Sequence, residues 1–173
     1  FKMNTTSMLQ KDSLKGKTIL VTGGGSGLGK SMSTEFLNLG ANVVIASRSL
    51  DKLEVAAKEM EDKTGGTVLP VQCNVKEYSD VENVLSETIK KFGSIDILVN
   101  NAGILSTTDQ QSIEHVDIDQ WRAVQSVNVE GVFLGCQTAV LAMKDTGGSI
   151  INMSSVAGFI ASPGIVAYAA SKG

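Results

Sequence analysis

A glycine-rich turn between an apolar run and a helical pattern is the feature that most limits how this chain can fold. The apolar run 19–21 predicts a buried strand, the turn Thr-Gly-Gly-Gly-Ser-Gly-Leu-Gly follows over 22–29, and a helical pattern extends over 30–39. A strand that ends on glycines and continues as a helix presents free backbone N–H groups and the positive end of a helix dipole. The turn therefore predicts an anion site, and the ligand we expect is a dinucleotide pyrophosphate.

Beyond this turn, apolar runs alternate with amphipathic helical patterns. Such an alternation forms right-handed βαβ units and a parallel sheet with helices on both faces. Near-continuous apolar runs such as 95–99 favour burial on both sides of the sheet. The predicted fold class is α/β, a Rossmann-type doubly wound parallel sheet. The predicted strands are 17–22, 42–47, 67–73, 95–99 and 148–154, and the predicted helices are 27–39, 50–63, 78–92 and 118–144.

The chain is predicted to be one domain with a lead-in. Residues 1–16 are polar and show no periodicity, so we expect a flexible lead-in before a dinucleotide-binding domain over 17–173. The net charge is −3 and lysine and arginine do not cluster, which argues against a nucleic acid or a membrane surface as a partner. No uninterrupted run reaches the roughly 18 to 20 apolar residues of a membrane span. With no secretory or transit pattern, the expected location is the cytoplasm.

Cysteine and histidine are too few and too scattered to predict a metal site. Cys73 and Cys136 are 63 positions apart, and neither has a second cysteine or histidine at ligand spacing. We interpret both as reduced packing residues. His115 is the single histidine, lies in a polar stretch, and is interpreted as a solvated loop residue. No metal cofactor is expected.

The glycines of the turn follow the spacing T-G-x-x-x-G-x-G rather than the more common dinucleotide fingerprint G-x-G-x-x-G. With this spacing the chain resembles the short-chain dehydrogenase/reductase family, from about Leu14 to its last residue. The resemblance implies a nicotinamide dinucleotide as cofactor. The turn residues that it assigns to cofactor binding are Gly23, Ser26, Gly27, Leu28 and Gly29.

Two later segments resemble the cofactor site of the same family. Asn74-Val75 follows the third strand and matches the pair that contacts adenine, although Asp is the commoner residue at the first position. The segment 100–103 reads Asn-Asn-Ala-Gly and matches the family's N-N-A-G, which supports the sheet and lines the cofactor site. The resemblance therefore adds to cofactor binding Asn74, Val75, Asn101, Ala102 and Gly103.

The end of the second strand favours NADP(H) over NAD(H). A fold that prefers NAD places Asp or Glu about 20 residues beyond the glycine turn, where it binds the ribose 2′-hydroxyl. This chain has Ser47 and Arg48 there, and a hydroxyl beside a guanidinium suits a 2′-phosphate. The alternative is that Arg48 is a solvated loop residue and that Asp51 turns back to the ribose.

The segment 168–172 carries the predicted reaction chemistry. Its i, i+4 spacing places Tyr168 and Lys172 on one helix face, and a nearby ammonium favours the ionised form of a phenol. Ser155 stands thirteen positions before Tyr168, as in the family, with Ser154 beside it as the residue most easily confused with it. Asn128 matches the helix asparagine that holds a relay water in the family, its alternative being a structural bond to a local carbonyl. The resemblance thus implies Asn128, Ser155, Tyr168 and Lys172 as catalytic residues, and Tyr168 and Lys172 as cofactor contacts too.

The resemblance is uneven, so more than one function stays open. Up to about Asn101 the sequence resembles 2,4-dienoyl-CoA reductases, and from Trp121 onward it resembles 3-oxoacyl, hydroxysteroid and secondary-alcohol dehydrogenases. Because the second half carries Ser155 and Tyr168, we predict the reaction of that branch, hydride transfer between NADP(H) and a small-molecule ketone or secondary alcohol. Dienoyl-CoA reduction is the alternative reaction. A nucleotide-binding fragment without turnover is the alternative of another class.

The family fold continues beyond the position of Gly173, so the sheet is expected to be truncated after its fifth strand. The outer edge of strand 148–154 is then expected to be bare, apolar and prone to pair with another chain. The resemblance also implies a homodimer or homotetramer in a full-length form, since the family packs helix 118–144 against its counterpart in a neighbouring subunit. Gly131 and Gly135 permit close approach of another backbone to this helix, either from that neighbour or from the same subunit.

Overall fold

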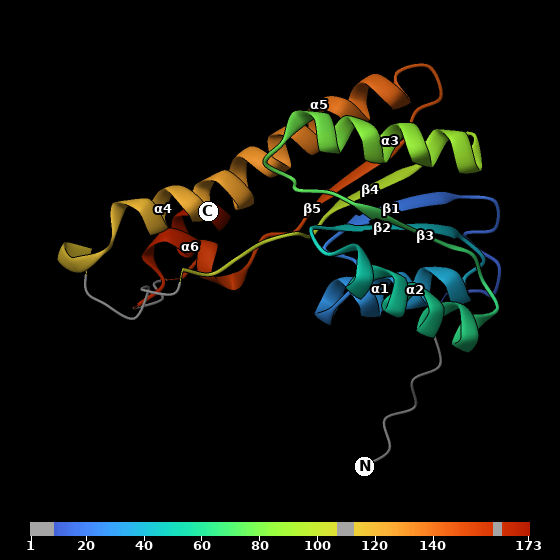
Figure 1. Ribbon diagram of the computed structural model, residues 1–173, viewed down its shortest axis with the longest axis horizontal. Coiled ribbons are helices and arrows are strands. Elements are labelled where there is room, and N and C mark those ends of the chain that lie inside the picture. The colour runs from blue at the N-terminus through green and yellow to red at the C-terminus, as the bar shows by residue number, and fades with distance from the viewer. Residues whose placement is uncertain (1–8, 107–112, 161–163) are drawn as a thin grey trace, which may run out of the picture.

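The computed structural model describes residues 9–106, 113–160 and 164–173, and its centre is a parallel β-sheet with helices on both faces (Figure 1). The strands are β1 (Thr18–Thr22), β2 (Asn42–Ser47), β3 (Val68–Gln72), β4 (Ile97–Asn100) and β5 (Ser149–Asn152). Their order in the sheet is β3-β2-β1-β4-β5, and each neighbouring pair is parallel. The predicted Rossmann-type doubly wound sheet is therefore confirmed.

Alternate side chains of each strand point to opposite faces of the sheet, so both faces are apolar and helices cover both. The helices are α1 (Gly27–Asn38), α2 (Leu50–Thr64), α3 (Tyr78–Phe92), α4 (Ile118–Gln125), α5 (Gly131–Met143) and α6 (Val166–Lys172). Ile19 and Val21 of β1 pack in one core with α1 and α2, and Leu20 packs in a second core with α3 and α5. Burial on both faces explains why the strands are apolar runs rather than alternating patterns.

The predicted helix 118–144 is interrupted by a turn of π-helix, η2 (Ser126–Glu130), between α4 and α5. The Gly131 N–H donates to the Ser126 carbonyl, five residues back, where an α-helix would bond four residues back. The chain stays helical throughout, so the predicted element exists but has one widened turn that apolar periodicity did not reveal. Boundaries also differ at four strands: 17–22 is observed as 18–22, 67–73 as 68–72, 95–99 as 97–100 and 148–154 as 149–152.

The helix 118–143 has the length and overall hydropathy of a membrane span, although it contains no uninterrupted apolar run of that length. Polar residues such as Asn128, Glu130 and Gln137 interrupt its apolar residues. Its buried side includes Gly135, Ala139 and Met143, and the last two belong to the core between α5 and the sheet. Packing against the sheet accounts for the buried apolar residues of α5, whereas Phe133, Val140 and Leu141 are exposed.

The two glycines of α5 face other parts of the same chain, the loop after β3 and the end of β4. A Cβ on Gly131 would lie 2.8 Å from the Cγ2 of Val75, and a Cβ on Gly135 would collide with the side chain of Asn100. Both glycines are buried. Of the two alternatives for these glycines, the structure shows close packing within the subunit, and a homo-oligomer stays a prediction.

The two ends of the domain differ in how they are covered. β5 is the last strand of the sheet and pairs with β4 alone among the described strands, and Ile151 is 44% exposed. At the other end, the Leu14 N–H donates to the Leu39 carbonyl at 2.9 Å, and its side chain packs on the core of α1 and α2. This contact holds the last part of the predicted lead-in, whose residues 1–8 lie outside the described residues. The edge exposed at β5 matches the predicted bare edge, and pairing with another chain stays a prediction.

Candidate active site

The glycine turn joins β1 to α1 in the geometry that its residues require. Gly23 and Gly27 have positive φ angles of 67° and 50°, a conformation that glycine adopts without steric cost. A Cβ on Gly29 would collide with the Gly23 carbonyl, so this glycine allows α1 to pack directly under the turn. A Cβ on Gly27 would meet no atom within 4 Å, and Ser26, Gly27 and Leu28 are exposed. The turn therefore offers open space beside the N-terminus of α1.

Thr22 ties this turn to the N-N-A-G segment. Its Oγ1 accepts hydrogen bonds from the backbone N–H groups of Asn101 and Ala102, both at 3.0 Å. The Asn101 side chain returns a bond to the Thr22 carbonyl at 2.9 Å. Our sequence reasoning gave Thr22 no role, although its position at the end of β1, beside the parallel β4, could have indicated one. These bonds fix the two loops that would approach a cofactor from either side.

A cleft of about 220 Å³ lies at the ends of β2 and β3 and contains most of the predicted adenosine contacts. Its lining includes Gly23, Ser26, Ser47, Arg48, Asn74, Val75, Ala102 and Gly103. The Arg48 side chain is exposed and has no hydrogen-bond or ion-pair partner among the described residues, while its carbonyl accepts a bond from Gln72 at 3.0 Å. Asp51 does not line this cleft and borders a separate hollow between α1 and α2. The arrangement favours Arg48 over Asp51 as the group that meets the ribose.

Cys73 also lines the cleft but is chemically quiet. Burial raises the pKa of its thiol to about 12, with a smaller contribution from the Asp80 carboxylate. A thiol with this pKa stays protonated near neutral pH and is a poor nucleophile. The Asp80 carboxylate accepts a bond from the Asn74 N–H at 2.9 Å and so shapes the loop after β3.

Tyr168 and Lys172 lie on α6, beyond the strand ends (Figure 1). The Lys172 ammonium donates to the Met153 carbonyl at 2.7 Å and lies 5.7 Å from the centre of the Tyr168 ring. Burial lowers the pKa of Lys172 below its usual value. A Cβ built on Gly103 would lie 3.7 Å from Lys172 Nζ, so the N-N-A-G segment reaches the lysine. The predicted phenol and ammonium therefore lie together beside the cofactor cleft.

The structure separates the two neighbouring serines by their hydrogen bonds. The Ser154 hydroxyl donates to the Lys172 carbonyl at 2.7 Å and holds the end of α6. Ser155 caps a short 3-10 turn, η3 (Val156–Gly158), where its Oγ accepts a bond from the Ala157 N–H at 3.2 Å. The Ser155 proton has no acceptor among the described residues. Ser155 is therefore the serine that can still donate to a substrate oxygen.

Asn128 is buried in the π-turn and bridges two distant segments. Its Oδ1 accepts a bond from the Ile104 N–H at 2.9 Å, and its Nδ2 donates to the Ile104 carbonyl at 3.0 Å. The same Nδ2 donates to the Ser171 hydroxyl at 2.9 Å. The side chain thus bonds a loop and α6 rather than a carbonyl of its own helix, which was the alternative from the sequence.

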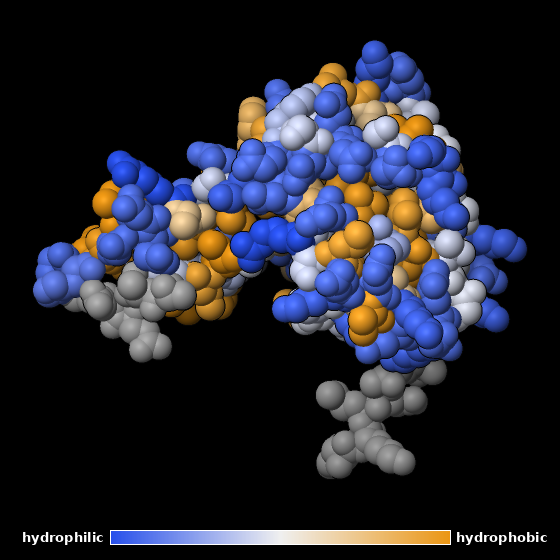
Figure 2. Space-filling model, viewed as in Figure 1, coloured by the Kyte–Doolittle hydropathy of each residue, from blue (hydrophilic) through white to orange (hydrophobic). Residues whose placement is uncertain are grey.

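Apolar surface adjoins this end of the molecule. Val156, Phe159 and Ile160 follow Ser155 and are 67%, 85% and 59% exposed. Figure 2 shows hydrophobic surface beside α6, on the side that faces the sheet. A substrate that reaches Ser155 would therefore meet apolar side chains.

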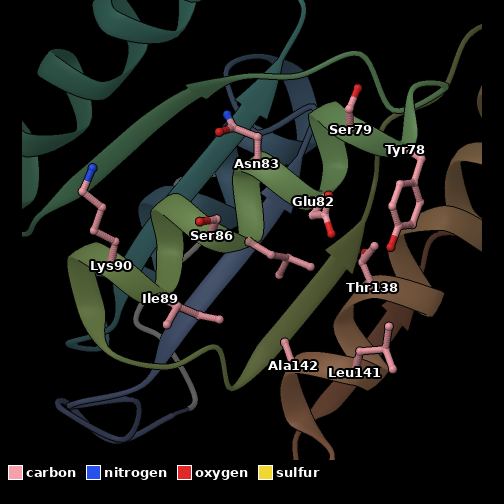
Figure 3. Close-up of a pocket in the computed structure, with 11 residues that line it drawn as sticks. Tyr78, Ser79, Glu82, Asn83, Ser86, Ile89, Lys90, Thr138, Leu141 and Ala142 are labelled. Atoms are coloured by element: carbon pink, nitrogen blue, oxygen red, sulfur yellow. The ribbon is translucent and has the colours of Figure 1, made fainter.

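A second and wider groove, of about 800 Å³, lies between α3 and α5 and away from these groups (Figure 3). Tyr78, Ile89 and Leu141 contribute apolar surface to it, and Glu82 and Lys90 contribute opposite charges. None of the predicted cofactor or catalytic residues lines it. We therefore place the candidate active site at the strand ends and not in this groove.

The sequence and the fold are both similar to those of known proteins. The sequence matches the short chain dehydrogenase family over residues 17–173. It is 40% identical over 166 residues to an NADP-dependent (R)-specific alcohol dehydrogenase of Lentilactobacillus kefiri, an alignment that covers 94% of this chain and 63% of that protein. A short-chain type dehydrogenase/reductase from Mycobacterium marinum has a TM-score of 0.88 and 36% identity, covering 96% of this chain and 68% of that one. An NAD+-bound xylitol dehydrogenase has a TM-score of 0.87 and 27% identity, covering 92% and 61%.

These comparisons agree with the observed fold. The chain spans 63% of the length of the curated relative it matches. The match begins at Lys17, where the predicted domain begins, and continues to the last residue. The chain belongs to the short-chain dehydrogenase family.

Proposed function

We propose that the protein is an oxidoreductase that transfers a hydride between a nicotinamide dinucleotide and a ketone or secondary alcohol. The observation that carries this proposal is the position of Lys172 between the Tyr168 ring and the N-N-A-G wall of the cofactor cleft. An ammonium there can serve both the phenol and a bound ribose. Relatives named as an alcohol dehydrogenase and a xylitol dehydrogenase support this reaction, and they do not favour dienoyl-CoA reduction.

The shape of the site fits a dinucleotide. The open space beside Gly27 and the free N–H groups at the start of α1 suit a pyrophosphate. The cleft at the ends of β2 and β3 suits the adenosine half, where the Asn74 amide can bond the adenine. When bound, the nicotinamide supplies or accepts the hydride.

In this proposal Tyr168 gives its phenolic proton to the carbonyl oxygen in reduction and takes a proton from the alcohol in oxidation. Ser155 donates a hydrogen bond to the same oxygen, since its own proton is unused by the described residues. The Lys172 ammonium stabilises the phenolate by charge attraction. The apolar side chains after Ser155 would contact the carbon substituents of the substrate.

Asn128 has a positioning role in the proposed reaction. Its amide already bonds Ile104 twice and Ser171 once. These bonds use both amide protons and one of the two acceptor positions of Oδ1, and we propose that Asn128 holds the loop at Ile104 against α6.

The preferred cofactor in this proposal is NADP(H). An exposed guanidinium with no partner among the described residues, beside the Ser47 hydroxyl, is the arrangement expected for a 2′-phosphate site. The name of the Lentilactobacillus relative, an NADP-dependent enzyme, supports this choice, whereas the xylitol dehydrogenase structure contains NAD+.

Self-association through the outer face of α5 is also proposed. Phe133 and Val140 lie along this face and are 61% and 55% exposed, and Val129, on the preceding turn η2, is 45% exposed. Apolar side chains in one stripe on a helix are typical of a helix that packs against a partner. A second copy of the chain would bury them.

The proposed function is tested by titrating the protein with NADPH and by assaying turnover over a panel of ketones and secondary alcohols. Binding together with ketone-dependent NADPH oxidation is the expected result. Binding without oxidation of NADPH by any ketone would support a nucleotide-binding fragment instead. If the protein binds neither NADPH nor NADH, the result contradicts the proposed function.

A further inference from the structure

The short helix α6 needs outside support to hold Tyr168 and Lys172 in place. It has seven residues, whereas isolated helices shorter than about 12 to 15 residues are marginal in water. Ile165 precedes it without a side-chain capping bond. Its fully buried residue is Ala167, a small side chain that buries little apolar area. Hydrogen bonds to neighbouring elements therefore carry an unusually large share of its placement.

Gln125 supplies one of these bonds at the start of α6. It is the last residue of α4 and lies half-buried where the π-turn begins. Its Nε2 donates to the Ala167 carbonyl at 3.0 Å, directly before Tyr168 in the chain. The bond joins positions 42 residues apart, so it ties separate parts of the fold together.

Ser171 supplies the second connection one turn further along. Its hydroxyl accepts from the Asn128 amide at 2.9 Å and donates to the Tyr168 carbonyl at 2.7 Å. The donor and an acceptor position of this hydroxyl are therefore both used. A continuous chain of bonds runs from the Ile104 loop through Asn128 and Ser171 to the backbone of Tyr168.

We propose that Gln125 and Ser171 are positioning residues, which clamp α6 against α4 and η2 at two points and thereby fix Tyr168 and Lys172 relative to the cofactor cleft. The catalytic part of this inference rests on the proposed function. The mechanical part does not, because the two bonds hold α6 whether or not a substrate is turned over. Neither residue touches the predicted reacting groups with its side chain, so each acts through the helix.

The test uses four variants of the full chain. Gln125→Met removes the amide but keeps the length and helix propensity of the side chain. Ser171→Ala removes the hydroxyl, and Ser171→Thr restores one. Glu54→Met is the control, because Glu54 is exposed on α2, away from α6, and has no hydrogen bond from its side chain among the described residues.

Three measurements are made on each variant: amide hydrogen exchange of α6, the dissociation constant of NADPH, and kcat and KM for a ketone. One lost hydrogen bond of about 1 kcal/mol is a factor of about five. We expect α6 exchange to rise about five-fold and kcat to fall about five- to ten-fold in Gln125→Met and Ser171→Ala. The ketone KM should change less than two-fold, NADPH should bind a few-fold more weakly through Lys172, and Ser171→Thr should recover most of each loss.

The outcomes separate this inference from the proposed function. Unchanged α6 exchange in both Gln125→Met and Ser171→Ala would overturn the clamp. Equal effects of Glu54→Met would also overturn it, because the changes would then reflect general loosening of the fold. If the wild-type chain shows no NADPH binding, the proposed function fails, and the exchange measurement still decides whether the clamp exists.

Discussion

Replacing Arg48 with alanine tests the proposed preference for NADP(H), because the surroundings of Arg48 set the expected loss of NADPH affinity. The guanidinium has no partner among the described residues, so a 2′-phosphate would not have to displace an existing ion pair. The Gln72 bond to its carbonyl fixes the backbone that carries it. A hydrogen bond to a charged group is worth about 1.5 to 3 kcal/mol. Because the side chain is exposed and screened by salt, we take about 1.5 to 2 kcal/mol, a factor of about 10 to 30 in Kd.

The assay is a fluorescence titration of wild type and Arg48→Ala with NADPH and with NADH. The NADPH Kd should rise about 10- to 30-fold, and the NADH Kd should change less than two-fold, because NADH lacks the 2′-phosphate. Arg122→Ala is the control, since Arg122 is also exposed but pairs with Asp119 on α4. The wild-type affinity for NADPH should also weaken more steeply with salt than that for NADH. Equal losses for the two cofactors in Arg48→Ala would refute the assignment.

Two further predictions concern the proton donor and the stability of the sheet. Tyr168→Phe should lower turnover by roughly 10²- to 10⁴-fold and leave the NADPH Kd within a few-fold of wild type. Lys172→Ala should reduce both turnover and NADPH affinity. Wild-type turnover in Tyr168→Phe would contradict the acid–base role of Tyr168. Burial tends to raise the pKa of Asp96, but its bonds from the Lys17 ammonium and the Thr18 N–H outweigh burial and lower it overall. This lowering contributes stability above about pH 4 that is lost as the pH falls through the lowered pKa, so Asp96→Asn should show a smaller drop in Tm between pH 5 and pH 3 than wild type; parallel Tm curves would contradict this.

The sheet could be predicted from the sequence because its strands are buried on both faces. Runs such as 19–21 and 43–46 have few polar residues to confuse the pattern, and glycines such as Gly93 close the helices between them. The strand ends were less certain, because they depend on where a neighbouring strand stops. β5 ends at Asn152, opposite Asn100 at the end of β4, its single neighbour in the described sheet.

The details of the site depend on bonds between residues far apart in the chain, which local patterns do not reveal. Asn128 and Ser171 are 43 positions apart, and the π-turn that places Asn128 changes the helical period by a single residue. Ser154 and Ser155 are neighbours of the same type, but their bonds differ. Ser154 bonds the end of α6, whereas Ser155 caps η3. The motifs therefore predicted which residues gather at the strand ends, and the structure supplied how they are held.

Gly135→Ala distinguishes the two explanations for the glycines of α5. Alanine favours a helix over glycine by about 1 kcal/mol, so the substitution should stabilise the domain if Gly135 faces open space or only a partner subunit. In the structure the added methyl would collide with Asn100, whose Nδ2 donates to Asn152 at 2.9 Å and links β4 to β5. Such overpacking costs about 1 to 3 kcal/mol.

The net expectation for Gly135→Ala is a loss of up to about 2 kcal/mol, or a Tm lower by up to about 8 °C, since about 2 to 4 °C corresponds to 1 kcal/mol at this size. This loss should not depend on protein concentration, because the collision lies within one chain. Glu54→Ala, on the exposed face of α2, should leave Tm nearly unchanged. A higher Tm in Gly135→Ala, with weaker self-association in sedimentation, would instead mean that the glycine is needed for a second subunit and that Asn100 can move aside.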